Sequence, residues 1–311
     1  MSNKILVTDS LFIFDEHVEQ LKAAGFEVEK LDKPQATEEE LCKAVKGKVG
    51  YILGGIEKVT DKVINTADEL KAIIFTGADW AGFIPGHEVA TKKEIAIANT
   101  PGANTYAVAE YTLTLMLIML RKVLELTRVS DKTFMTAQSL TDVKIGVVGM
   151  GRIGERVTRM LKGLGVEDIN YWNRTRKLEL EKELGLKYLP LEEIYSTCDL
   201  ISYHVSSRAG QLIGKDLIKR IKKDSIIINA GSDVAYDVAA LYDKIIANNL
   251  HVAFDYNLND KRYKNLPLTN WFCSNSSTAY NTYAANKLAS DMATQSIINL
   301  LKTGSDDNRV N

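Results

Sequence analysis

A glycine-rich turn carries the clearest chemical signal in the chain. Gly149, Gly151 and Gly154 lie in "VVGMGRIGER" with G-x-G-x-x-G spacing, directly after an apolar strand pattern and at the start of a helical one. In that context glycines let the backbone approach a pyrophosphate, and the amides of Arg152 and Ile153 open a helix whose N-terminus attracts negative charge. We therefore predict a dinucleotide site here. A purely structural turn is the alternative.

The segment after the next strand indicates which dinucleotide binds. Asn173 in "YWNRTRK" stands where an acidic residue would hold the adenosine 2′-hydroxyl. A carboxylate there would repel a 2′-phosphate, whereas an amide does not. Arg174, Thr175 and Arg176 add two cations and a hydroxyl that suit a phosphate. We predict that NADP(H) is preferred over NAD(H); the alternative is a solvated basic loop.

Three further strand ends are expected around the reactive ring. Ligands of open parallel sheets lie beyond the carboxyl ends of the strands. "LISYHV" ends at His204 and Val205, and "SIIINAG" ends at Ala230 and Gly231. "HVAFDYN" reaches Asp255. These residues are predicted to surround a nicotinamide.

The elements that position these residues alternate along the chain. Short β-rich runs such as "KILVTDS", "GYILGG" and "AIIFTG" are separated by amphipathic helical segments, and the second half repeats the plan. This alternation predicts an α/β protein with parallel sheets and crossover helices. Two such series indicate two doubly wound domains, with a break near "IANTPGANTYAVAE".

The composition narrows the class of protein. The 311 residues include 39 Lys and Arg against 40 Asp and Glu, so no global field attracts nucleic acid or an anionic membrane. Three scattered cysteines exclude a disulfide framework, and neither they nor the four histidines form a metal-binding pattern. The N-terminus has no signal-peptide core, and the apolar run Tyr111–Leu120 is too short to cross a bilayer. We expect a cytoplasmic chain without a metal site.

At the level of whole motifs, the chain resembles the D-isomer-specific 2-hydroxyacid dehydrogenases, the family of D-lactate, glyoxylate/hydroxypyruvate and phosphoglycerate dehydrogenases. The matching motifs run nearly end to end: "FTGADWAG", "IANTPGANTYAVAEYTL", "VKIGVVGMGRIGERV", "CDLISYHV" and "DSIIINAG". The resemblance implies two Rossmann-like domains with an active site in the interdomain cleft. Residues 1–100 plus 283–311 would form the substrate-binding domain and residues 101–282 the dinucleotide-binding domain. It also implies a small-molecule substrate and a homodimer.

The three catalytic residues that the resemblance implies are altered here. The family's Arg, which clamps the 2-oxo acid, falls on Ser232. Its Glu falls on Asp260, and its proton-donating His falls between Asn275 and Ser277, with no histidine after His251. A charged hydrogen bond contributes about 1.5–3 kcal/mol, and loss of a general acid removes roughly 10² to 10⁴ in rate. The usual mechanism is therefore not expected to be efficient.

Other parts of the implied site remain. The loop formed by Gly77, Ala78 and Asp79 resembles the family's carboxylate cradle, so the substrate could be carboxylated. Asp255 could orient the nicotinamide carboxamide. His204 matches a family histidine beside the cofactor, and a packed imidazole at a strand end is favoured over a catalytic one.

Several side chains near the strand ends could replace the lost groups. Three cations could reach the site, although a solvated surface position is favoured for each: Arg208, Lys261 and Arg262. Three tyrosines could donate a proton, and the sequence does not choose among them: Tyr236, Tyr256 and Tyr280.

Three functions are compatible with this pattern. The first is an NADPH-dependent reductase of a small carbonyl or imine compound with altered catalytic residues. An imine that is already protonated is electrophilic without help from an Arg–His pair. The second is a conventional 2-hydroxyacid dehydrogenase in which Asp260 and a displaced cation substitute for the lost groups. The third is a sensor or scaffold that binds NADP(H) without turnover.

Overall fold

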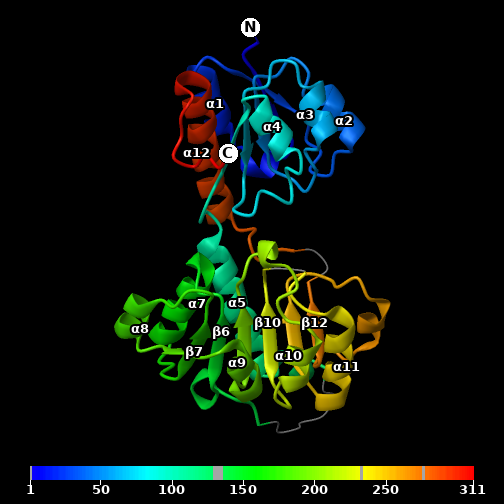
Figure 1. The fold of residues 1–311 in the computed structure, drawn as a ribbon, viewed down its shortest axis with the longest axis vertical. Coiled ribbons are helices and arrows are strands. Elements are labelled where there is room, and N and C mark those ends of the chain that lie inside the picture. The colour runs from blue at the N-terminus through cyan, green and yellow to red at the C-terminus, as the bar shows by residue number, and fades with distance from the viewer. Residues whose placement is uncertain (1, 129–135, 232–233, 275–276) are drawn as a thin grey trace. The chain divides into compact units, whose positions relative to one another are not determined.

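The computed structural model describes residues 2–128, 136–231, 234–274 and 277–311. It divides into two compact units, each built around a parallel sheet (Figure 1). Unit 1 comprises Met1–Asn104 and Asn281–Asn311, and unit 2 comprises Thr105–Tyr280. The prediction of an α/β protein with two doubly wound parallel sheets is confirmed.

Unit 1 holds a five-stranded sheet in the order β2-β1-β3-β4-β5. Its strands are β1 (Lys4–Val7), β2 (Glu27–Lys30), β3 (Gly50–Leu53), β4 (Ala72–Phe75) and β5 (Ala96–Asn99). Its helices are η1 (Ser10–Phe12), α1 (Asp15–Ala23), α2 (Glu38–Ala44), α3 (Asp61–Thr66), α4 (His87–Lys92) and α12 (Tyr283–Thr303).

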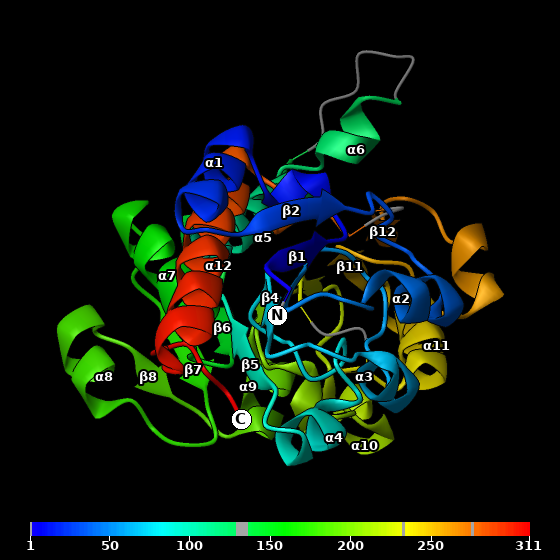
Figure 2. The ribbon, with the colours of Figure 1, turned by 90° about the horizontal axis from the view of Figure 1, so that it is seen from above.

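Both faces of this sheet are covered because its strands are apolar on both sides. Ile5 and Ile52 pack with Ile297 of α12 on one face, where α12 lies beside α1 (Figure 2). Leu6 packs with Leu41 of α2 on the other face. Alternate side chains of a strand point to opposite faces, so continuous apolar strands require helices on each side.

Unit 2 holds a seven-stranded sheet in the order β12-β11-β10-β9-β6-β7-β8. Its strands are β6 (Ile145–Val148), β7 (Ile169–Trp172), β8 (Lys187–Tyr188), β9 (Leu200–Tyr203), β10 (Ile226–Asn229), β11 (His251–Phe254) and β12 (Trp271–Cys273). Its α-helices are α5 (Thr105–Leu120), α6 (Val123–Leu126), α7 (Arg152–Gly163), α8 (Leu178–Leu184), α9 (Leu191–Thr197), α10 (Lys215–Arg220) and α11 (Val238–Asn248). Its 3₁₀ turns are η2 (Leu140–Asp142), η3 (Ser207–Ala209) and η4 (Lys261–Asn265).

The register of the central strands places the residues that follow β6, β9, β10 and β11 at the same edge of the sheet, the edge formed by the carboxyl ends of these strands. Val148 at the end of β6 is opposite Tyr203 at the end of β9, and Asn229 at the end of β10 is opposite both Tyr203 and Phe254. The loops that follow β6, β9, β10 and β11 therefore leave the sheet side by side.

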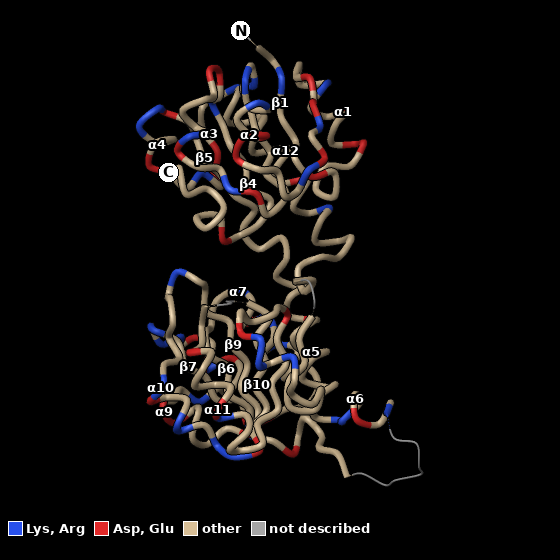
Figure 3. The backbone as a smooth tube through the Cα atoms, turned by 90° about the vertical axis from the view of Figure 1, so that its right-hand side faces the viewer, with Lys and Arg blue, Asp and Glu red and all other residues tan. Residues whose placement is uncertain are grey.

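Basic and acidic residues are mixed along the chain of each unit. Figure 3 shows Lys and Arg interspersed with Asp and Glu along the backbone of both units. Within the described residues, no helix combines the length and the apolar character needed to cross a membrane.

Candidate functional site

The turn after β6 depends on glycine at two positions. Gly149 has a left-handed backbone (φ 96°), and a Cβ there would lie 2.8 Å from the carbonyl carbon of His204 and 2.8 Å from Val205 Cγ2. A Cβ on Gly154 would lie 1.9 Å from the carbonyl oxygen of Gly149. Backbone atoms cannot move away from such contacts cheaply, so this tight turn requires both glycines.

The space in front of α7 is open by contrast. Gly151 is the N-cap of α7, where no side chain caps the helix, and a Cβ on Gly151 would meet nothing within 4 Å. The amides of Arg152 and Ile153 in the first turn have no partner within the helix. The open space at Gly151, the first-turn amides without a helical partner and the positive end of the helix dipole together suit a pyrophosphate.

Asn173 connects this turn to the end of β7. Its Oδ1 accepts a hydrogen bond from the Met150 amide at 3.0 Å, and its Nδ2 donates to the Thr175 carbonyl at 2.8 Å. The carboxamide therefore has a structural role as well as being uncharged. The residue at this strand end, next to the open start of α7, therefore carries no negative charge.

The two arginines after Asn173 differ in their surroundings. Arg176 is held by Glu181, with Nη2 2.6 Å from Oε2 and Nε 3.0 Å from Oε1, and it lies over the ring of Tyr188. Arg174 is exposed and forms no ion pair within the described part of the chain. Arg174, with the exposed Thr175, is therefore better placed than Arg176 to meet a phosphate.

His204 is fixed at the end of β9. Its amide donates to the Val148 carbonyl at 2.7 Å, and its Nε2 lies 2.7 Å from Ser202 Oγ. Loss of water around the ring lowers the pKa of the imidazole to about 3. A neutral, packed ring of this kind cannot supply a proton near pH 7, which favours the packed interpretation of this residue.

This half-buried imidazole makes the stability of the fold depend on pH. Above pH 6.5 the ring is neutral in both the folded and the unfolded chain, but between 6.5 and about 3 only the unfolded chain takes up the proton. We expect the free energy of unfolding to fall as the pH falls through this window, and His204→Gln to reduce that slope. Urea unfolding of both proteins at several pH values measures it. Parallel curves from pH 7 to pH 4 would contradict it.

Asp255 organises the segment that follows β12. Its buried carboxylate accepts hydrogen bonds from Ser277 Oγ at 3.0 Å, from the Thr278 amide at 2.9 Å and from the Ala279 amide at 2.8 Å. These bonds occupy the carboxylate predicted to orient a carboxamide. Asp255 also places the exposed Ser277 at this edge of the sheet.

Asn229 links the loop after β10 to the loop after β11. Its Oδ1 accepts from the Gly231 amide at 2.9 Å, and its Nδ2 donates to the hydroxyl oxygen of Tyr256. Ala230 is partly buried and Gly231 is exposed at this edge. Ser232 and Asn275, two of the predicted catalytic positions, lie outside the described residues.

Asp260 and Ser277 do not pair within the described residues. Asp260 is the N-cap of η4, and its carboxylate is 2.6 Å from Nη2 of Arg262. Hydrogen bonds from Arg262 lower the pKa of Asp260. Asp260 therefore has a capping role, and Arg262 is engaged beside it. Arg208 and Lys261 lie exposed in η3 and η4.

The predicted carboxylate cradle lies in unit 1, directly after β4. The Gly77 carbonyl accepts from the Thr100 amide at 3.2 Å, and the Ala78 carbonyl accepts from Asn99 Nδ2 at 2.8 Å. Within the described chain, the amides of Gly77 and Ala78 donate to no protein acceptor. With Asp79 next in the loop, this arrangement fixes the carbonyls and leaves two amides for an anionic ligand.

Comparison with known proteins identifies the family. The profile described as "D-isomer specific 2-hydroxyacid dehydrogenase, NAD binding domain" matches residues 113–275. A D-3-phosphoglycerate dehydrogenase of Methanocaldococcus jannaschii is 31% identical over 258 residues, which cover 80% of this chain and 48% of that protein. The chain belongs to the D-isomer-specific 2-hydroxyacid dehydrogenase family.

A second relative matches over a similar share of its own length. A glyoxylate reductase of Korarchaeum cryptofilum is 34% identical over 164 residues, which cover 49% of each chain. The matches therefore span about half the length of these relatives.

Two solved structures share the fold over the whole chain. An NAD⁺-bound 3-phosphoglycerate dehydrogenase from Entamoeba histolytica has a TM-score of 0.85 at 23% identity and covers 100% of this chain and 99% of its own. An acyclic imino acid reductase in complex with NADPH and D-arginine has a TM-score of 0.84 at 21% identity and covers 99% of this chain and 100% of its own.

The sequence did not single out the Asn229–Tyr256 pair of this family member. A signal for it exists, because Asn229 is a polar residue that ends the otherwise apolar strand "IIIN". A buried amide at such a position needs partners, and the tyrosine just beyond the neighbouring strand provides one. The described residues contain no group of three or more His, Cys, Asp and Glu side chains that could hold a metal ion.

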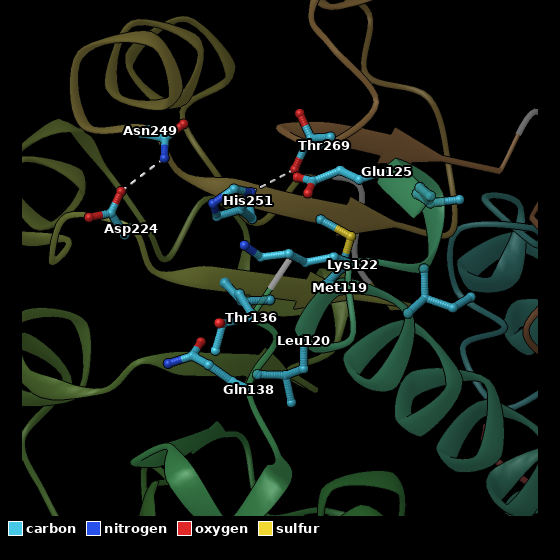
Figure 4. A pocket seen from close by; sticks show the side chains of 13 residues that line it. Met119, Leu120, Lys122, Glu125, Thr136, Gln138, Asp224, Asn249, His251 and Thr269 are labelled. Atoms are coloured by element: carbon cyan, nitrogen blue, oxygen red, sulfur yellow. Dashed lines mark hydrogen bonds between the residues drawn. The ribbon is translucent and has the colours of Figure 1, made fainter. Parts of the chain in front are cut away.

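A cavity of about 350 Å³ lies at the amino ends of β10 and β11, away from the predicted site residues (Figure 4). Three of its lining residues have left-handed backbones: Lys122 (φ 53°), Asp224 (φ 59°) and Asn249 (φ 49°). Asn249 donates to Asp224 at 2.9 Å, and His251 Nδ1 lies 2.7 Å from the Thr269 carbonyl. None of the predicted site residues lines this cavity.

Proposed function

We propose that this family member is an NADP(H)-dependent reductase of a small carbonyl or imine compound, with altered catalytic residues. The observation that carries the proposal is the open, uncapped start of α7 behind Gly151, next to a strand end without a carboxylate. When bound, a dihydronicotinamide dinucleotide would supply hydride. The predicted ring neighbours His204, Val205, Ala230, Gly231 and Asp255 follow adjacent strands.

The substrate class follows from the groups that remain. The amides of Gly77 and Ala78 suit a carboxylate, so a carboxylated substrate is included in the proposal. A protonated imine needs less activation than a ketone. A solved structure of the same fold is an acyclic imino acid reductase bound to NADPH, which supports including imines in the first assays.

Cofactor titration tests the first half of the proposal. Calorimetry should show NADPH binding at least about tenfold more tightly than NADH, because a charged hydrogen bond to the 2′-phosphate contributes about 1.5–3 kcal/mol. Arg174→Ala should remove most of that preference. Arg176→Ala is the matched control and should change it less, since Glu181 already neutralises Arg176. A tenfold preference for NADH in the unmodified protein would overturn the assignment.

Turnover tests the second half. NADPH oxidation is followed with a panel of carbonyl compounds and cyclic and acyclic imines, with glyoxylate and hydroxypyruvate included. Preference for these two 2-oxo acids would instead indicate a conventional 2-hydroxyacid dehydrogenase. This is the second candidate function, and the similarity to a glyoxylate reductase supports it. Tight binding with no oxidation of NADPH at high enzyme concentration would indicate a sensor or scaffold.

We also propose that the protein is a homodimer in a reducing cytoplasm. Leu117 of α5 and Val123 and Leu126 of α6 are exposed apolar residues, and α6 projects from the body of unit 2 (Figures 2 and 3). Exposed apolar surface of this kind favours association. The three cysteines are free thiols, as is usual for proteins of a reducing cytoplasm. If analytical ultracentrifugation finds only monomer at micromolar concentration, the proposed dimer is wrong.

A further inference from the structure

The loop after β4 is held by two residues at the end of the neighbouring strand. Phe75 at the end of β4 is opposite Asn99 at the end of β5, so the segments that follow these strands leave the sheet side by side. Asn99 Nδ2 donates to the Ala78 carbonyl at 2.8 Å, and the Thr100 amide donates to the Gly77 carbonyl at 3.2 Å. The peptide planes on both sides of the Ala78 Cα atom are therefore held from the end of β5.

These two bonds also set the direction of an unoccupied donor. In a trans peptide the N–H points opposite to the C=O. The bond from Thr100 to the Gly77 carbonyl therefore turns the Ala78 N–H away from β5, and Ala78 is exposed. Since the amides of Gly77 and Ala78 donate to no acceptor within the described residues, both are available to a ligand.

The start of this loop requires glycine because an aromatic ring fills the space beside it. A Cβ on Gly77 would lie 2.6 Å from Phe75 Cε1. The Phe75 ring is stacked on Phe83, with ring centroids 4.7 Å apart, so it is not free to turn aside. The backbone can pass this closely to the ring only without a side chain at residue 77.

Asn99 is fixed on its other side by the segment that follows α12. Its amide donates to the Asn308 carbonyl at 3.3 Å, and the Val310 amide donates to the Ile97 carbonyl at 2.8 Å. Asn99 is also buried. A buried side chain on a fixed backbone presents its donor in one direction, which makes Asn99 a suitable anchor for the loop.

We propose that Asn99 is a positioning residue that holds the Gly77 and Ala78 amides in the orientation in which they bind the carboxylate of the substrate. Asn99 acts on the substrate through the loop. Donors that are already oriented lose little freedom when an anion arrives, so more of their interaction energy appears as affinity. This assignment rests on the proposed function and makes a carboxylated carbonyl or imine compound the preferred substrate.

The unmodified protein provides the first test. Oxamate, a small carboxylate that is not a hydride acceptor, should shift the amide resonances of Gly77 and Ala78 in ¹H–¹⁵N spectra, and the titration gives its Kd. If oxamate shifts neither resonance, the assignment is wrong. This measurement needs no variant, so it stands even if a substitution at Asn99 prevents folding.

Asn99→Ala tests the positioning role. Oxamate binding should weaken about three- to tenfold, the range expected for one neutral hydrogen bond, whereas the NADPH affinity of unit 2 should not change. With substrates from the panel, kcat/KM should fall more for a carboxylated compound than for an uncarboxylated one. Equal losses for the two compounds would contradict the role.

Asn311→Ala is the matched control on the same strand. Asn311 Oδ1 accepts from the Ile97 amide at 2.7 Å, and its Nδ2 donates to the Ile95 carbonyl at 2.9 Å, but it does not contact the loop after β4. The variant should lower Tm and keep oxamate affinity within about twofold. Equal weakening of oxamate binding by Asn99→Ala and Asn311→Ala would show that Asn99 acts only through the stability of β5 and would overturn the assignment. If NADPH does not bind, the proposed function fails, whatever the result with oxamate.

Discussion

Gly154→Ala is expected to destabilise unit 2 by about 3 kcal/mol and to abolish dinucleotide binding. The new methyl group would lie 1.9 Å from the Gly149 carbonyl oxygen, a backbone atom in a turn that His204 and Val205 already confine. Relief requires α7 to move away from β6, which separates the helix N-terminus from the strand ends. Urea unfolding followed by far-UV circular dichroism measures the loss, and calorimetry with NADPH measures binding.

Gly151→Ala, three residues earlier in the same motif, provides the matched control. A methyl group there meets nothing within 4 Å, so the free energy of unfolding should fall by no more than about 1 kcal/mol, the cost of alanine in place of glycine at an N-cap. Dinucleotide affinity should still fall, because the methyl group projects into the approach used by a pyrophosphate. If Gly151→Ala binds NADPH as tightly as the unmodified protein, the pyrophosphate does not lie at this turn.

Asp255→Ala is expected to cost about 3 kcal/mol or more in the free energy of unfolding. The substitution removes a buried carboxylate and leaves the amides of Thr278 and Ala279 and the hydroxyl of Ser277 without their acceptor. Each charged hydrogen bond contributes about 1.5–3 kcal/mol, and part of that returns when the exposed groups of Ser277 and Thr278 bind water. Chemical denaturation measures the cost, and hydrogen exchange at residues 278 and 279 shows whether the segment is released.

Asp260→Ala is the comparison for this change, since it also removes a carboxylate that caps a local turn. Asp260 is paired with Arg262 near the surface, where solvent weakens the pair, so its loss should destabilise the protein much less than the loss of Asp255. Equal destabilisation by Asp255→Ala and Asp260→Ala would show that the 277–279 segment is not held by Asp255.

The parts of the fold and site that local patterns control were predictable from sequence. The alternation of apolar strands with helical segments predicted both sheets, and the spacing of Gly149, Gly151 and Gly154 predicted the turn after β6, because that turn is built from contiguous residues. The site residues themselves remain predictions, although the register of β9, β10 and β11 brings their strand ends together.

The side-chain partners within the site were not predictable. Arg176 and Glu181 belong to a loop and the following helix, and nothing in the sequence says that their charges meet. Asp255 and residues 277–279 are brought together by the pairing of β11 with β12. The sequence offered three tyrosines without ranking them, because hydroxyl partners depend on packing between strands rather than on spacing along the chain.

The double hydrogen bonding of Asn173 has a consequence for how cofactor preference can evolve. A carboxylate oxygen could accept the Met150 hydrogen as readily as the carboxamide oxygen does, so an acidic residue at this position would preserve the turn. The donor to the Thr175 carbonyl would be replaced by an oxygen that repels it, so that carbonyl would have to turn away. A single substitution at this position would thus change the charge that a dinucleotide meets while it keeps the hydrogen bond that holds the glycine turn.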